Sequence, residues 1–127
     1  MINLSVANRY KDYGKLKGSV WKWFRLQVNQ KDLSPRNKII LWSLAERFRG
    51  QSFSVWDSYT YLSKMVGLSR KTFSKGMGEL SEQGIIWIAV EGDERMAFKK
   101  LPQQVRVKKH ILLVGLNNVL YEDLKEV

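Results

Sequence analysis

The segment from Tyr61 to Ile86 constrains the fold of this chain more than any other part of the sequence. Its pattern predicts a helix, a tight turn at Gly67-Leu68-Ser69, a second helix and then a strand. Ser69 should be the N-cap of the second helix, because its hydroxyl can accept a hydrogen bond from a backbone N–H that lacks a partner within the helix. Gly84 should end that helix, because glycine adopts the left-handed conformation after a helix without strain.

The second of these helices separates apolar residues from basic ones. Phe73, Met77 and Leu80 recur at the spacing of one helical face and predict its buried stripe. No acidic residue lies between Ser58 and Gly78. A short helix with a cationic outer face, braced against another helix, has a shape that fits the major groove of DNA. The residues expected on that outer face are Arg70, Lys71, Ser74 and Lys75.

Three short runs follow one another in this segment: Gly67-Leu68-Ser69-Arg70-Lys71-Thr72-Phe73, then Glu79-Leu80, then Gly84-Ile85-Ile86. Together they resemble the helix-turn-helix of winged-helix DNA-binding domains, such as those of bacterial regulators and of phage or plasmid replication proteins. The resemblance extends from about Ser34 to Lys100. It implies an α+β fold, a winged helix (three-helix core with a β-hairpin wing) elaborated by N- and C-terminal segments. It also implies sequence-specific binding of double-stranded DNA, in transcription regulation or in recognition of a replication origin.

Residue types suggest how the contacts with DNA would be divided. Arg70 is expected to read a base edge, because its planar guanidinium can donate two hydrogen bonds to O6 and N7 of guanine. Lys64, Lys99 and Lys100 are expected to bind phosphates, which fixes the register without reading the sequence. Many proteins of this kind bind as dimers, and a homodimer is left open here. The predicted DNA-binding residues are Lys64, Ser69, Arg70, Lys71, Thr72, Ser74, Lys75, Arg95, Lys99 and Lys100.

The charge balance independently favours a polyanionic partner. Lys and Arg outnumber Asp and Glu by 22 to 12, which gives a net charge of +10 and is typical of nucleic-acid-binding proteins. Without Cys and with a single His, disulfides and thiolate zinc sites are excluded and a His-based metal site is disfavoured. We therefore expect neither a metal nor a cofactor. No apolar run is long enough to span a bilayer, and no signal-peptide pattern opens the chain, so we expect a cytoplasmic protein without a membrane partner.

No arrangement of residues predicts an enzyme. The sequence contains neither a phosphate-binding Gly-x-x-x-x-Gly-Lys loop nor a Gly-x-Ser-x-Gly elbow. The carboxylate pairs Asp93-Glu94 and Glu122-Asp123 lie in a predicted turn and in the C-terminal tail, where solvated charges are the simplest interpretation. We therefore expect no catalytic residues.

The N-terminal part is less clearly patterned. Residues 1–19 are basic and suggest an arm, either lying along DNA or disordered, ahead of a single domain at 20–127. From Val20 to Val28 apolar and polar residues alternate and predict a strand, with a helix as the alternative. Trp21 and Trp23 would then lie on the less buried side, where they would cover the edge of the core, dock a protein or stack on bases.

The first helix of the winged-helix core starts at Ser34-Pro35, which supply the N-cap and the first helical residue, and it is expected to end at Gly50. Trp42 lies off the apolar stripe of this helix and is expected to touch the N-terminal segment. Phe53–Trp56 is a candidate short strand. One residue of Asp57-Ser58 should cap the next helix.

Gly76 and Gly78 are unexpected inside the recognition helix, because glycine there costs about 1 kcal/mol relative to alanine. Close packing around Met77 is the simpler explanation. The alternative is that Gly78 lets the helix sit close to a backbone such as that of DNA.

A β-hairpin wing is predicted after the recognition helix. Ile85–Val90 forms the outgoing strand, Glu91-Gly92-Asp93 the turn and Arg95–Lys100 the return. The acidic turn is poorly suited to approach a phosphate, which argues against entry of the wing tip into a minor groove. A further strand is expected within 104–116, as a candidate partner of Val20–Val28.

The C-terminus should end in a short helix, Val119–Lys125, capped by Asn117. The apolar residues of this C-terminal segment either form a dimer contact or complete the core. They are Leu112, Leu113, Leu116 and Leu120.

Two other functions stay open. A winged helix can serve as a protein-interaction module in a replication or recombination complex, using Trp21, Trp23 and the C-terminal apolar segment. Alternatively, the chain binds single-stranded nucleic acid or RNA by stacking bases on an aromatic and basic cluster, which comprises Trp21, Trp23, Phe24 and Arg25.

Overall fold

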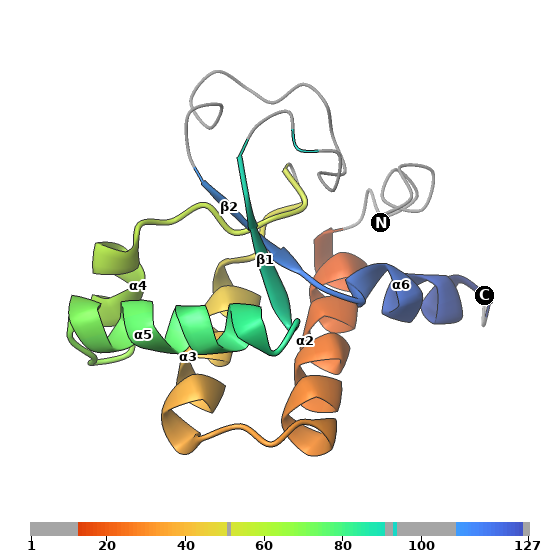
Figure 1. Cartoon of the computed structure of the whole chain (residues 1–127). Helices are drawn as coiled ribbons and strands as arrows, with labels where there is room; N and C mark the ends of the chain where they lie inside the picture. Colours follow the sequence, from red (N-terminus) through yellow and green to blue (C-terminus); the bar gives the residue numbers. More distant parts are fainter. Residues whose placement is uncertain (1–12, 51, 91–92, 94–108, 126–127) are drawn as a thin grey trace.

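The computed structural model describes residues 13–50, 52–90, 93 and 109–125. In these residues five helices and a two-stranded antiparallel sheet make up an α+β fold (Figure 1), which confirms the expected class. No helix in the described residues is long and apolar enough to cross a membrane. The elements are α2 (Tyr13–Gln30), α3 (Pro35–Arg47), α4 (Tyr59–Met65), α5 (Arg70–Glu82), β1 (Ile86–Ala89), β2 (His110–Leu113) and α6 (Leu116–Lys125).

The three central helices begin where their caps predict. The hydroxyls of Ser34, Ser58 and Ser69 each accept a hydrogen bond of 3.1 Å from the backbone N–H three residues later, and each begins a helix. Gly67 and Gly84 both adopt a positive φ of 73°, the first in the turn between α4 and α5 and the second after α5. These caps and glycines confirm the predicted helix, turn and helix.

α3 ends three residues before the predicted boundary at Gly50, because Phe48 leaves the helical conformation and is buried.

A side chain of α2 binds the C-terminal end of α3. The ammonium of Lys17 donates hydrogen bonds to the carbonyls of Ala45 and Glu46, which are among the carbonyls that lack a partner within the helix. A cation at this end also interacts favourably with the helix dipole.

The sheet joins segments that lie far apart in the sequence. β1 pairs with β2 over four residues, from Ile86 opposite Leu113 to Ala89 opposite His110. On its other side β2 meets Val55, which exchanges two backbone hydrogen bonds with Ile111. The predicted strand at Phe53–Trp56 is therefore present only as isolated bridges.

Only part of the predicted wing falls within the described residues. Its outgoing strand is confirmed as β1, but the turn residues Glu91 and Gly92 and the predicted return strand at 95–100 lie outside the described residues. The strand expected within 104–116 is present as β2, yet its partners are β1 and Val55, so the predicted pairing with Val20–Val28 is wrong.

The segment from Val20 to Val28 is helical, so the predicted strand is wrong. Leu16, Val20 and Trp23 lie on one helical face and are all buried, with 2% or less of each residue exposed. Burial of this stripe outweighs the alternation farther along, because most of a helix's stability in a protein comes from packing of its apolar face. The proposed arm is corrected as well, since 13–19 belong to α2, while residues 1–12 lie outside the described part.

The C-terminal helix starts earlier than predicted. α6 begins at Leu116, so Asn117 lies inside it and is not its N-cap. α6 packs against α2 (Figure 1). The four leucines proposed for a dimer contact each expose 2% or less, so they complete the core and are not available as an interface; they are Leu112, Leu113, Leu116 and Leu120.

At Gly76, α5 packs tightly against side chains of α3. A Cβ at this position would lie 2.3 Å from Cδ1 of Ile40 and 2.7 Å from Oδ1 of Asn37. Ile40 is fully buried, and Asn37 is held by hydrogen bonds to Arg36 and Glu79. We therefore expect Gly76→Ala to lower the free energy of unfolding by about 1–2 kcal/mol, since crowding outweighs the gain in helix propensity. Urea unfolding followed by circular dichroism measures this difference.

Gly78 supplies a matched control two residues away on the same helix. It is exposed, and a Cβ there would meet no other atom within 4 Å. Gly78→Ala should therefore raise the free energy of unfolding by about 0.5–1 kcal/mol through helix propensity alone. If both substitutions stabilise the protein, the close contact between α3 and α5 is wrong.

Candidate nucleic-acid interface

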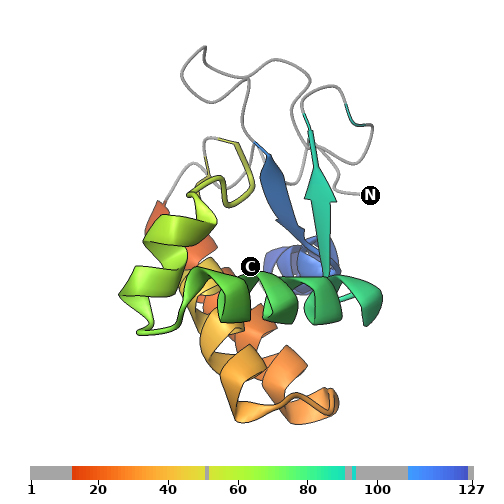
Figure 2. The same ribbon diagram turned by 60° about the vertical axis from the view of Figure 1, so that its left-hand side comes forward.

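α5 presents the predicted cationic face to solvent. Phe73, Met77 and Leu80 are buried, as expected. In Figure 2 α5 runs across the front of the molecule, and β1 rises from near its end. The four residues predicted for the outer face are all exposed; they are Arg70, Lys71, Ser74 and Lys75.

Two further predicted contact residues, Ser69 and Thr72, hydrogen-bond to each other at the start of α5. The hydroxyl of Ser69 accepts the backbone N–H of Thr72 and donates to its side-chain oxygen at 2.8 Å. Thr72 is half-buried. This pair of side chains fixes the first turn of α5 and thereby positions the exposed residues beside it.

The carboxylate of Glu79 is bound by residues of α3. Arg36 donates to both carboxylate oxygens, at 2.5 and 2.9 Å, and the amide of Asn37 donates to one of them at 3.0 Å. The hydrogen bonds from Asn37 and Arg36 lower the pKa of Glu79. Glu79 therefore stays ionised at neutral pH, and its charge is compensated by Arg36.

A broad groove runs along the exposed side of α5. It encloses about 790 Å³ and is lined by Tyr59 together with the four outer-face residues Arg70, Lys71, Ser74 and Lys75. The structure thus brings these four residues to one concave surface. Lys64 is exposed on the last turn of α4 and does not line this groove. The predicted contacts Arg95, Lys99 and Lys100 lie outside the described residues.

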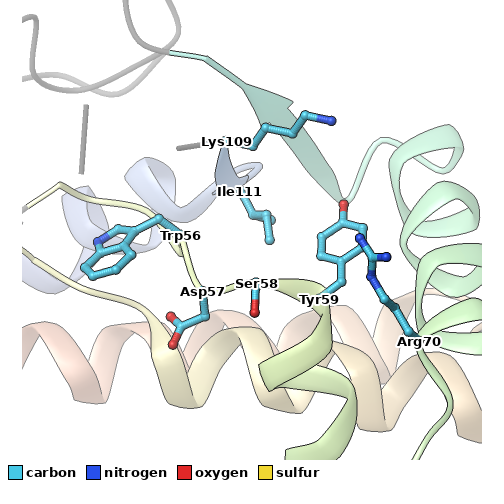
Figure 3. Close-up of a pocket in the computed structure, with 7 residues that line it drawn as sticks. All are labelled: Trp56, Asp57, Ser58, Tyr59, Arg70, Lys109 and Ile111. Carbon is cyan, nitrogen blue, oxygen red and sulfur yellow. The ribbon is translucent and has the colours of Figure 1, made fainter. Parts of the chain in front are cut away.

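A second, smaller cavity adjoins the start of α5 (Figure 3). It has a volume of about 310 Å³, and Arg70 and Tyr59 line both cavities. Two of its residues, Tyr59 and Lys109, were missed by the sequence analysis as candidate contacts. The cavity is lined by Trp56, Asp57, Ser58, Tyr59, Arg70, Lys109 and Ile111.

Tyr59 is half-buried at the start of α4, and its ring packs against Phe73 with the ring centroids 5.5 Å apart. Burial raises the pKa of the phenol, so the hydroxyl is protonated at neutral pH and can donate a hydrogen bond. Lys109 is exposed and immediately precedes β2. The basic pattern of residues 104–109 was a signal in the sequence, but only the pairing of β2 places Lys109 beside α5.

Among the described residues, Asp57 is the only carboxylate that lines the smaller cavity, and two arginines compensate its charge. Its side chain is 8% exposed and binds both Arg47 and Arg49. The guanidinium of Arg49 also lies over the ring of Trp56, 4.0 Å from its centroid. This cluster fixes the connection between α3 and α4 and leaves the cavity with a surplus of positive charge from Arg70 and Lys109.

The single histidine is part of the core. Nδ1 of His110 lies 2.7 Å from the hydroxyl of Ser54, which is itself 2.9 Å from that of Ser52. All three residues are buried, so this Ser–His pair has no contact with solvent. Within the described part of the chain, no group of three His, Asp or Glu side chains is placed to hold a metal ion.

A separate aromatic surface lies on α2 and α3. Trp42 contacts Trp21 with the ring centroids 6.2 Å apart, as the sequence predicted, and Trp21 packs edge-on against Phe24. Trp42 is 41% exposed and the nearby Ile39 is 45% exposed. Trp23 is different: it is 1% exposed and donates a 2.7 Å hydrogen bond from Nε1 to the carbonyl of Val114, so its predicted place on the less buried side is wrong.

No family model, no curated protein and no solved structure matches the chain.

Proposed function

We propose that this chain binds double-stranded DNA in a sequence-specific manner, as a winged-helix protein with α5 as its recognition helix. One observation carries the proposal. The apolar face of α5 is buried, and its opposite face places three exposed cations and a serine along one groove. These four residues are Arg70, Lys71, Ser74 and Lys75.

The order of the elements supports the winged-helix architecture. Three helices, α3, α4 and α5, precede an antiparallel pair, β1 and β2, and the segment before α4 joins that pair through Val55. This order supports a three-helix core followed by an antiparallel strand pair, in which residues 90–109 connect β1 to β2. Lysines on the α5 face and on α4 would supply the sequence-independent attraction to phosphates, and Arg70 would read a base edge.

The biological role proposed is regulation of transcription or recognition of a replication origin. In either role the chain would act by occupying a DNA site, without catalysing a reaction. The proposed partner is therefore a duplex site, and a homodimer would bind two half-sites about one helical turn apart.

Selection of bound sequences from a random duplex pool tests this function. We expect one enriched motif, and a palindromic motif would indicate a dimer. Binding without any enriched motif would reduce the function to non-specific attachment. Tighter binding to single strands than to any duplex would replace the proposal with the single-strand alternative.

Arg70→Ala tests the base-reading role. We expect it to weaken binding to the selected duplex by on the order of 1–3 kcal/mol and to relax the preference at one position of the site. Fluorescence anisotropy with the selected duplex and with single-base variants measures both effects. Equal losses on the selected and on random duplexes would show that Arg70 contacts a phosphate instead.

A second candidate function, protein interaction, is favoured by the exposure of Ile39 and Trp42 on α3. These residues lie on a different helix from the α5 face, so both functions can coexist.

We expect sedimentation velocity to show self-association at high concentration if this surface is a homodimer contact. Trp42→Ala should then restore the monomer without changing affinity for a half-site duplex, and a wild-type chain that stays monomeric at all concentrations argues against this contact.

A further inference from the structure

The smaller cavity beside α5 has the composition of an anion site. Its lining includes two cations, Arg70 and Lys109, which come from different parts of the chain. The carboxylate of Asp57 does not offset them, because Arg47 and Arg49 bind it. Among the described lining residues positive charge is therefore in excess, and an excess of positive charge raises the local concentration of anions.

The cavity also offers a neutral hydrogen-bond donor close to these cations. Figure 3 shows Trp56 at one end of the cavity and Tyr59 and Arg70 at the other, with Ile111 between them. Lys109 lies above Ile111, and its side chain extends toward the end that holds Tyr59. Because burial raises the pKa of Tyr59, its hydroxyl keeps its proton at neutral pH. An ammonium and a phenol that share a concave site suit the tetrahedral oxygens of a phosphate.

We propose that this cavity is a phosphate-binding subsite in which Lys109 and the hydroxyl of Tyr59 hold one phosphate of the DNA backbone. This inference rests on the proposed function and extends it. Arg70 lines both cavities, so a phosphate held beside it would fix the position from which Arg70 reaches the groove. The subsite would thus set the register of α5 on the duplex.

The test compares Lys109→Ala with a matched control, Lys38→Ala. Lys38 is also exposed, but it lies two residues along α3 from Arg36, which faces α5, and therefore points to another side of that helix. Lys109→Ala should weaken binding to selected and random duplexes alike, on the order of tenfold at 0.1 M salt, and should reduce the slope of log K against log salt by about 0.9. Lys38→Ala should change neither quantity.

Tyr59→Phe examines the second donor. It removes only the hydroxyl and keeps the ring that packs on Phe73, so we expect unchanged thermal stability and about two- to tenfold weaker duplex binding without a change in salt slope. If Lys109→Ala and Tyr59→Phe both match Lys38→Ala while the wild-type chain binds its duplex normally, the subsite is wrong and the proposed function survives. If the wild-type chain binds no duplex, the proposed function fails.

Titration of the free protein with inorganic phosphate, followed by NMR shifts at Lys109 and Tyr59, separates the two sources of phosphate. We expect weak binding that is lost in Lys109→Ala, together with the loss of duplex affinity described above. Phosphate binding that Lys109→Ala abolishes while duplex affinity stays unchanged would overturn the DNA backbone as the occupant and assign the subsite to a small phosphate compound.

Discussion

Replacing Phe73 by alanine should destabilise the protein by about 3–5 kcal/mol, because removal of a buried aromatic ring leaves a cavity that the surrounding residues fill only in part. Phe73 is fully buried, and its ring contacts that of Tyr59. This residue connects the inner face of α5 with α4. Urea unfolding of the variant and of the wild-type protein measures the loss.

The adjacent residue gives the control for Phe73. Ser74 is exposed, and Ser74→Ala should change the free energy of unfolding by no more than about 0.5 kcal/mol. A loss of DNA binding in Phe73→Ala would follow from unfolding and carry no information about contacts. An unchanged unfolding midpoint for Phe73→Ala would reverse the inner and outer faces of α5, and the roles of Arg70, Lys71, Ser74 and Lys75 would be lost with them.

Trp23→Ala should cost a similar amount, about 3–5 kcal/mol, because it removes a large buried ring. It also removes the hydrogen bond from Nε1 to the carbonyl of Val114. Trp23→Phe isolates that bond: it keeps most of the apolar surface and should cost about 1–3 kcal/mol, since the carbonyl loses its partner. Trp21→Ala should cost less than Trp23→Ala, because Trp21 is only half-buried.

The same variants test the single-strand alternative. Affinity for duplex and single-stranded DNA is measured at a temperature where each variant stays folded, and we expect both to be unchanged in Trp23→Phe. A loss of affinity for single-stranded DNA alone, at wild-type stability, would mean that Trp23 stacks on bases. That result would contradict the burial of Trp23 in the structure.

Local signals in the sequence were sufficient to predict the helix, turn and helix from α4 to α5. Ser58 and Ser69 cap their helices and Gly67 and Gly84 adopt positive φ, because each of these features depends on a few neighbouring residues. The inner and outer faces of α5 follow from helical spacing alone. The exposed residues of the candidate site that lie on α5 could therefore be predicted without a structure.

Features that depend on distant partners were missed. The alternation in Val20–Val28 suggested a strand, while the stripe of Leu16, Val20 and Trp23 starts before that window and is buried against other elements. The pairing of β2 with both β1 and Val55 joins residues that are far apart in the sequence, from 21 positions for Ala89 and His110 to 56 positions for Val55 and Ile111. Lys109 entered the site only through that pairing, so no local pattern could place it beside α5.

The binding of Glu79 by Arg36 and Asn37, together with the close contact at Gly76, has a consequence for the energetics of recognition. These contacts join α5 to α3 as a rigid body before any ligand arrives. If α5 is the recognition helix, as proposed, its backbone loses little freedom on binding. The entropy lost is then that of the exposed side-chain ends, about 0.5–1.5 kcal/mol for each side chain that becomes ordered. A surface prepared in this way favours fast docking and discriminates by fit, since it cannot deform to accommodate a ligand of another shape.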